Sequence, residues 1–173
     1  MQLSIRQATA HDIDAMVEIL SEVARWLEER GMPMWRQDEL LPSHIVADVD
    51  SGQFFLAECD GVPAGTIRFQ LADKLFWPDV PQDDSAFIHS LAVRRRFAGR
   101  EISSALLLWA IARTYTLGRR YLRLDCEASR ARLRAVYERI GFRFHSNKKV
   151  GPYFVARYEY DITQISPSTW KPK

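Results

Sequence analysis

The sequence predicts a single domain of mixed α/β class, with a central mixed β-sheet of about seven strands and helices on both faces. The length of 173 residues suits one domain. Periodic segments follow one another along the chain in the order β-α-α-β-β-β-α-β-α-β-β. The composition, 47% hydrophobic and 27% charged, excludes collagen-like, coiled-coil and disordered classes. No apolar run reaches the roughly 18 residues of a membrane span, so we expect no membrane partner.

The first part of the chain predicts a strand, two helices and a hairpin. Residues 3–6 alternate apolar and polar side chains, which is typical of a strand. A helix ended by Gly31 and Pro33 comes next, because apolar residues recur at helical spacing: Ile13, Met16, Val17, Leu20, Val23, Ala24 and Leu27. We expect a short second helix at about 43–49. The turn signal Asp60-Gly61 then joins strands at 53–59 and 62–71 into a hairpin.

The second part predicts one β-α-β crossover and a closing hairpin. Residues 72–84 form a loop, and strands at 86–93 and 121–126 flank a helix at 102–117, so these strands should be parallel neighbours. That helix is apolar on most faces, which predicts burial on more than one side. A fourth helix ends at Gly141, and strands at 142–145 and 153–160 close the domain around Gly151-Pro152. The domain should span residues 1–162, with a flexible tail over 163–173.

The charge balance and the cysteine content indicate which binding partners and which cellular compartment to expect. The balance of 24 basic against 22 acidic residues, a net charge of +2, gives no bulk signal for nucleic acid. Cys59 and Cys126 form no disulfide framework, and the N-terminus has no apolar signal region, so a cytoplasmic location is expected. The four histidines and two cysteines show no close metal-ligand spacing, so we expect no metal.

The connector after the strand at 86–93 is the first candidate site. Ligands bind where parallel strands end and a helix begins, and helix N-terminal N–H groups suit a phosphate. The connector carries Arg94, Arg95, Arg96 and Arg100, with Gly99 at the turn. Solvated arginines ahead of a helix explain the same composition, so both interpretations stay open.

Three segments carry a resemblance to a known family: FIHSLAVRRRFAGREISSALLLWA at 87–110, YLRLDC at 121–126 and LRAVYERIGF at 133–142. They resemble the GNAT superfamily of N-acetyltransferases, and the likeness covers about residues 3–160. The most specific part is the Tyr-Glu-x-x-Gly-Phe segment that begins at Tyr137. The resemblance implies acetyl transfer from acetyl-CoA to an amine, by direct attack in a ternary complex.

The resemblance also implies roles for individual residues. Backbone groups of Leu91, Ala92 and Val93 would hold the acetyl arm. Tyr137 would protonate the leaving thiolate, although its place on an apolar helix stripe also fits a core residue. The pyrophosphate and its surroundings would be bound by Arg96, Ala98, Gly99, Arg100, Glu101, Ile102, Ser103, Ser104 and Arg130.

A neutral amine must attack, so a base is needed. His89 is one candidate for this base. It shares an alternation with Phe87, Leu91 and Val93, so a core-facing histidine is the alternative. Asp125 and Glu127 are lesser candidates.

The phosphate-binding turn departs from the family pattern Gln/Arg-x-x-Gly-x-Gly/Ala. The three defined positions carry Ala98, Glu101 and Ser103, and Arg130 replaces a frequent asparagine. A glycine matters if the backbone needs a positive φ, whereas a helical φ would let Glu101 point to solvent. The alternative function is therefore a binding or regulatory domain with weakened catalysis.

Aromatic residues suggest where the acceptor binds. Trp26, Trp35 and Trp77 lie in the segments that should face it, and Phe76 and three aspartates (Asp79, Asp83 and Asp84) are close in sequence. Aromatic rings and carboxylates suit a cationic small-molecule amine, with Asp125 as a further contact. A hydrophobic lid over the core is the alternative. The helix at 102–117 and the closing hairpin offer a homodimer surface, although burial within one chain explains them equally.

Overall fold

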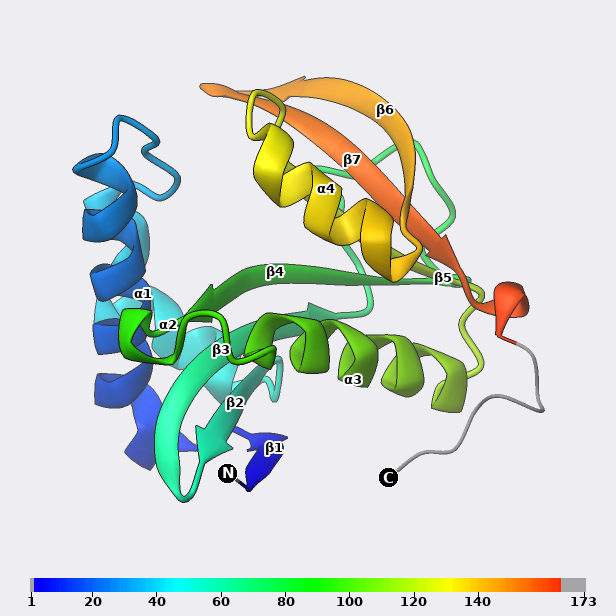
Figure 1. The fold of residues 1–173 in the computed structure, drawn as a ribbon. Helices are drawn as coiled ribbons and strands as arrows, with labels where there is room; N and C mark the ends of the chain where they lie inside the picture. The colour runs from blue at the N-terminus through cyan, green and yellow to red at the C-terminus, as the bar shows by residue number, and fades with distance from the viewer. Residues whose placement is uncertain (1, 166–173) are drawn as a thin grey trace. The chain divides into compact units, whose positions relative to one another are not determined.

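The fold, seen in a computed structural model, is described for residues 2–165 and comprises seven strands and four α-helices (Figure 1). The tail expected over 163–173 falls mostly outside this range. The strands are β1 (Leu3–Gln7), β2 (Phe54–Cys59), β3 (Val62–Gln70), β4 (Ser85–Val93), β5 (Tyr121–Glu127), β6 (Arg143–Val150) and β7 (Tyr153–Asp161). The helices are α1 (Ile13–Glu28), α2 (Pro42–Asp50), α3 (Ile102–Thr116) and α4 (Ala131–Ile140).

The strand order β1-β2-β3-β4-β5-β7-β6 makes the sheet mixed, as predicted. β4 and β5 pair in parallel, whereas β1–β2, β2–β3, β5–β7 and β6–β7 pair antiparallel. The chain divides into two compact units: Met1–Phe69 with Ser90–Leu107, and Gln70–His89 with Leu108–Lys173. We refer to them as the first and second unit, and the expectation of one domain over 1–162 stays a prediction.

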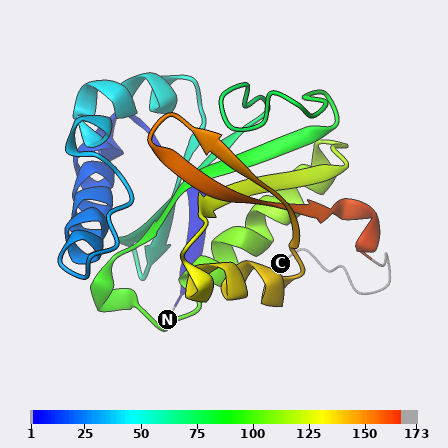
Figure 2. The same cartoon turned by 90° about the horizontal axis from the view of Figure 1, so that it is seen from above.

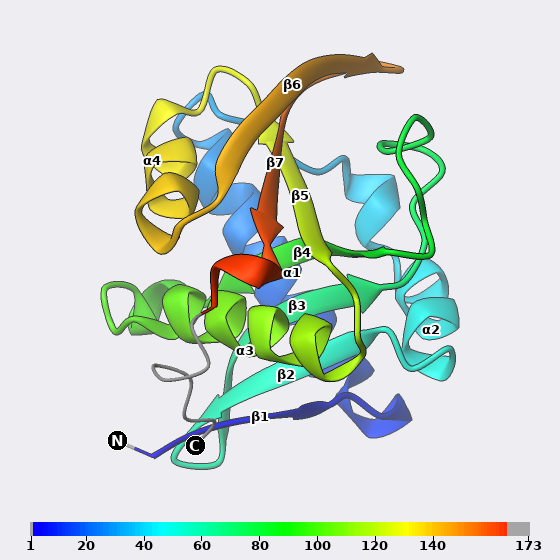
Figure 3. The ribbon, with the colours of Figure 1, turned by 90° about the vertical axis from the view of Figure 1, so that its right-hand side faces the viewer.

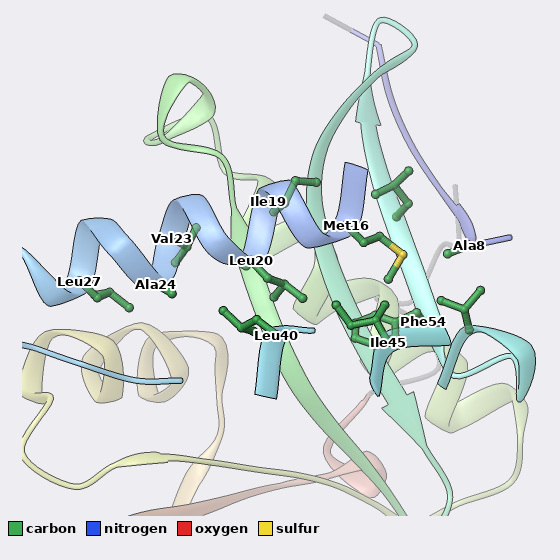
Figure 4. Packing of buried hydrophobic residues seen from close by; sticks show 13 residues of the cluster. Ala8, Met16, Ile19, Leu20, Val23, Ala24, Leu27, Leu40, Ile45 and Phe54 are labelled. Atoms are coloured by element: carbon green, nitrogen blue, oxygen red, sulfur yellow. The ribbon is translucent and has the colours of Figure 1, made fainter. Parts of the chain in front are cut away.

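In the first unit, helices cover both faces of the sheet. The predicted apolar stripe of α1 packs with α2 and with Phe54 and Leu56 of β2 (Figure 4). Gly65 of β3 faces the other way, toward Ile102 and Leu106 of α3. The Asp60-Gly61 hairpin is confirmed, since both residues have a positive φ, +50° and +77°.

The backbone of β4 is irregular at Ser90, which has a left-handed φ of +51°. Its carbonyl oxygen accepts a hydrogen bond from Thr66 Oγ1 at 2.9 Å. The predicted alternation from Phe87 to Val93 is therefore interrupted: Ala92, rather than Val93, is buried beyond this point.

In the second unit, α4 and the segment between β3 and β4 lie on opposite sides of β5 and β7 (Figures 2 and 3). Tyr137 of α4 packs on Tyr158, while Trp77 of the other segment packs on Phe87. Gly141 ends α4 with a φ of +113°, as its sequence position predicted. β6 extends to Val150, beyond the predicted end at residue 145. Its length was underestimated because it is an edge strand of mostly polar and exposed residues.

The prediction that the helix at 102–117 is buried on more than one side is wrong. The buried residues of α3 lie on one face: Ile102, Leu106, Leu107, Ala110, Ile111 and Thr114. Leu108 and Tyr115 are 51% and 54% exposed. Apolar composition alone therefore did not decide which face is covered. No helix within residues 2–165 is long and apolar enough to cross a membrane.

Candidate active site

The candidate site lies just beyond the last parallel pair of β4 and β5. Pairing runs from Ser85 with Tyr121 to Ile88 with Leu124, and His89 and Asp125 are the next residues on each strand. The atoms His89 Nδ1 and Asp125 Oδ2 are 3.9 Å apart. The carboxyl ends of parallel strands are the usual place for ligands in α/β sheets.

His89 is held by a buried aspartate from the segment between β3 and β4. Its Nε2 lies 2.8 Å from Asp73 Oδ2, and the backbone N–H groups of Leu75 and Phe76 donate to Asp73 Oδ1. Burial would raise the pKa of Asp73, but the His89 hydrogen bond and charge and the two N–H groups outweigh it, so this pKa lies below its usual value. An ionised carboxylate only accepts hydrogen bonds, so Nε2 carries a proton, and in the neutral imidazole the lone pair is on Nδ1.

Asp125 faces the other nitrogen of the same ring. Its side chain is only 8% exposed, and within residues 2–165 its Oδ2 atom receives no hydrogen bond. Burial raises the pKa of Asp125, and the Asp73 charge adds to this rise. The His89 charge and the indole N–H of Trp77 oppose it, although the indole group does not reach full hydrogen-bond geometry. Asp125 is thus a desolvated carboxylate with unused acceptor capacity.

Two buried arginines fasten the segment that carries Asp73. Arg157 donates to both carboxylate oxygens of Asp79, at 2.6 and 2.9 Å, and to the Phe76 carbonyl oxygen at 3.1 Å. The hydrogen bond from Arg157 holds the pKa of Asp79 well below its usual range. Arg123 lies 3.3 Å from Glu159 and 3.6 Å from Asp84. Asp79 and Asp84, which the sequence offered as acceptor contacts, are therefore already engaged with arginine.

The expected role of Trp77 needs correction. Trp77 is fully buried, at 0% exposure, and its ring contacts Phe87, His145 and the guanidinium of Arg157. A ring enclosed in this way offers no face to an acceptor. Its contribution is to pack the segment and to direct its indole N–H toward Asp125.

Asp73, His89 and Asp125 also bring three potential metal-donor atoms within 4.8 Å of one another. The histidine and cysteine spacing in the sequence did not reveal this group, because two of its members are carboxylates from separate segments. However, the imidazole directs Nε2 to Asp73 and Nδ1 to Asp125. One ring nitrogen binds one ion, so this arrangement suits a base between two carboxylates better than a shared ion.

Tyr137, the predicted acid, lies on α4 and is 5% exposed. Its ring packs against Phe142 and Tyr158, with centroids 6.1 Å away in each case. Burial raises the pKa of Tyr137 far above its usual value, and negative charge at Cys126 and Asp125 would add to the rise. The hydroxyl therefore keeps its proton at neutral pH, as a proton donor requires. Arg130 lies at the residue before α4.

The turn before α3 belongs to the first unit. Gly99 and Glu101 have left-handed φ values of +77° and +63°, and Glu101 is exposed. Glu101 thus occupies a conformation that favours glycine, which is the residue in the family pattern. Ser103 is helical, so a glycine is not required there.

Several residues of the first unit are already engaged within it. Arg94 pairs with Glu18 at 2.7 Å and Glu22 at 3.4 Å, which leaves less of its charge for a phosphate. The Arg95 guanidinium lies 3.8 Å from the ring centroid of Trp26. Trp35 packs against the core cluster. The rings of Trp26 and Trp35 therefore have protein contacts of their own.

The sequence identified His89 and Asp125 but missed Asp73. Asp73 lies 16 residues before His89, in a segment without periodicity. Its local signal is an aspartate that caps the next turn, accepting from the N–H groups two and three residues ahead. That signal predicts a turn and does not name the histidine.

A histidine that a carboxylate holds in place, at the ends of parallel strands, can act as a general base toward a bound substrate. Residues 14–142 match the sequence profile of the Acetyltransferase (GNAT) family. The chain is also 30% identical to the uncharacterized N-acetyltransferase YesJ of Bacillus subtilis (strain 168), over 90% of this chain and 88% of that protein. The chain therefore belongs to the GNAT acetyltransferase family and is an acyltransferase.

Solved structures share the fold. A GNAT family acetyltransferase from Listeria monocytogenes 4b F2365 aligns with a TM-score of 0.77 at 24% identity, covering 92% of this chain and 94% of that chain. The PaiA N-acetyltransferase from Thermoplasma acidophilum, solved with coenzyme A, aligns at 0.73 and 17%, covering 92% and 100%. YncA from Salmonella typhimurium, a putative acetyltransferase solved with acetyl-CoA, aligns at 0.72 and 16%, covering 100% and 99%.

Proposed function

We propose that this protein transfers an acetyl group from acetyl-CoA to a primary amine of a small molecule, by direct attack in a ternary complex. The observation that carries the proposal is the 2.8 Å contact of His89 Nε2 with the buried Asp73 carboxylate. A base fixed in this way presents Nδ1 to an incoming amine. Family membership and the coenzyme A complexes of proteins with the same fold support acetyl-CoA as the donor.

On the acceptor side, His89 Nδ1 takes one proton from the attacking amine. Asp73 keeps the ring in the required tautomer and stabilises the imidazolium that results. The side chain of His89 is 18% exposed, so an acceptor reaches the ring from solvent. A positioned base of this kind contributes about 10²–10⁴-fold to the rate.

On the donor side, acetyl-CoA supplies an acetyl group already activated as a thioester. The new C–N bond forms as the C–S bond breaks, and Tyr137 gives its proton to the leaving sulfur. We assign the acetyl arm to the backbone of Leu91, Ala92 and Val93. The phosphates are assigned to the turn at residues 98–104, with Arg96 and Arg130.

One observation favours a second candidate, a GNAT-fold binding domain with weakened catalysis. Glu101 places a carboxylate and a left-handed φ of +63° at the phosphate turn. Negative charge at a helix N-terminus competes with a phosphate for the same N–H groups.

The test is release of free thiol from acetyl-CoA in the presence of a panel of primary amines. His89→Gln should lower kcat by 10²-fold or more, and Asp73→Asn should lower it less, because the ring remains. Tyr137→Phe should also slow turnover. His44→Gln, at an exposed position of α2, is the matched control and should leave turnover unchanged.

Full activity in His89→Gln would remove this histidine from the mechanism. If the wild-type protein binds acetyl-CoA but releases no thiol with any amine, the binding-domain alternative is supported instead.

A further inference from the structure

The Asp125 carboxylate lies beside His89, the proposed catalytic base. Its Oδ2 atom is buried and receives no hydrogen bond within residues 2–165, and it faces His89 Nδ1 across 3.9 Å. Both atoms accept hydrogen bonds in the tautomer that Asp73 imposes. That distance is too long for a direct hydrogen bond, and one donor nitrogen at about 2.8 Å from each atom would bridge them.

Some carboxylates of this region are paired with arginine, whereas Asp73 and Asp125 have no arginine partner in the described part of the chain. Arg157 neutralises Asp79, and Arg123 lies against Glu159 and Asp84. Asp73 and Asp125 lie on either side of His89. The charge of Arg157 and the indole N–H of Trp77 act on Asp125 without donating a hydrogen bond to its Oδ2 atom. When both carboxyl groups are ionised, two negative charges face one imidazole. A buried carboxylate without a charged partner destabilises the folded protein. A cationic ligand that pairs with it removes this cost, and binding of that ligand is favoured accordingly.

We propose that Asp125 binds the ammonium group of the acceptor and thereby selects amines that have no carboxylate next to the nitrogen. This inference rests on the proposed function. A primary ammonium has three N–H groups, of which one points to Asp125 Oδ2 and another to His89 Nδ1. His89 Nδ1 takes one proton from the ammonium, which leaves the neutral amine in place for attack, and passes that proton to solvent at its exposed edge. It then takes a second proton from the nitrogen as the C–N bond forms, so both protons lost by the ammonium are accounted for. An acceptor with an α-carboxylate would bring a second anion toward Asp73 and Asp125 and is disfavoured.

The experiment compares two acceptors that differ only by that carboxylate, 2-phenylethylamine and phenylalanine, in the wild-type protein and in Asp125→Asn. We expect the wild-type kcat/KM to favour 2-phenylethylamine by at least tenfold. Asp125→Asn should reduce this preference at least tenfold, mainly by raising KM for 2-phenylethylamine. Asp50→Asn, at an exposed position at the end of α2, is the matched control and should leave the preference unchanged.

A structural role for Asp125 predicts a different result. Asparagine has the same shape and removes a desolvated charge, so Asp125→Asn should melt no lower than the wild type. Asp125→Glu should restore part of the preference, because it restores the charge. An unchanged preference in a folded Asp125→Asn protein overturns the inference.

A protein that acetylates neither compound is examined by calorimetric titration of 2-phenylethylamine alone. Binding that is lost in Asp125→Asn supports the ammonium site even though the proposed function has failed. Equal binding by the two proteins, or none by either, overturns the site independently of catalysis.

Discussion

Glu101 combines two features that oppose each other at one residue. Its φ of +63° lies in the left-handed region, where a side chain costs about 1 kcal/mol relative to glycine. Its carboxylate also lies one residue before α3, where negative charge is favourable to the helix and unfavourable to a bound phosphate. Two different substitutions of Glu101 can separate the effect of its backbone conformation on stability from the effect of its charge.

We predict that Glu101→Gly is more stable than Glu101→Ala by about 1 kcal/mol, because both remove the charge and only glycine relieves the backbone. For a chain of this size, that is a melting-point difference of about 2–4 °C. Thermal unfolding of the two variants measures it. Equal melting points would mean that the left-handed conformation costs nothing here.

His89 shows how a residue acquires a role from its partners. In β4, His89 is one more position of the alternating pattern, and it is half-buried where Phe87 is buried. The contact with Asp73 fixes its tautomer, and the proximity of Asp125 gives Nδ1 a charged neighbour. Neither carboxylate is adjacent to His89 in the sequence, so no local pattern could have specified this arrangement.

At the scale of elements, the start of α1 is tied to β1 by a charged network. Arg6 donates to both oxygens of Asp12, at 2.8 and 2.7 Å, and Asp12 also accepts from the N–H and hydroxyl groups of Thr9. The hydrogen bond from Arg6 is the main cause that holds the pKa of Asp12 well below its usual range. A carboxyl group with a lowered folded-state pKa stabilises the fold above its unfolded pKa of about 4 and loses this effect as the pH falls.

We therefore predict that Asp12→Asn destabilises the protein at pH 7 by about 1–3 kcal/mol and by much less at pH 2. The measurement is thermal or urea unfolding of variant and wild type across this pH range. Asp14→Asn, at an exposed position in the first turn of α1, should show little difference at either pH. An Asp12→Asn penalty that does not shrink in acid would show that the ion pair is not its source.

The segment between β3 and β4 shows why an aromatic, proline-containing stretch need not be a mobile lid. Arg157 and Gln82 hydrogen-bond to its backbone carbonyl groups, and Trp77 is wholly buried. In this loop, hydrogen bonds from side chains take the place of the regular backbone hydrogen bonds of a helix or strand. The sequence predicted a loop correctly, but its packing depended on arginines from β5 and β7.

At the scale of the whole molecule, ligand binding should be visible as stability. A ligand at 100 times its Kd stabilises the folded state by about 2.7 kcal/mol. We predict that saturating acetyl-CoA raises the melting point of the wild-type protein by about 5–10 °C. The measurement is thermal unfolding with and without acetyl-CoA, repeated on Glu101→Gly.

A rise only in Glu101→Gly would mean that this glutamate closes the phosphate turn, in support of the binding-domain alternative. No rise in either protein would contradict the assignment of acetyl-CoA as donor. The net charge of the protein is only +2, so nonspecific attraction of the anionic acetyl-CoA should contribute little to a rise in melting point.

The sequence by itself determined the order of the elements, the parallel pairing of β4 with β5, the hairpin at Asp60-Gly61 and the likeness to the GNAT family. These follow from hydrophobic periodicity, turn residues and short motifs, which are local properties of the chain. The tertiary structure alone decided that Asp73 holds His89, that Trp77 is enclosed and that only one face of α3 is covered. Each of these depends on which distant residues meet, and it is the packing of separate segments that brings them into contact.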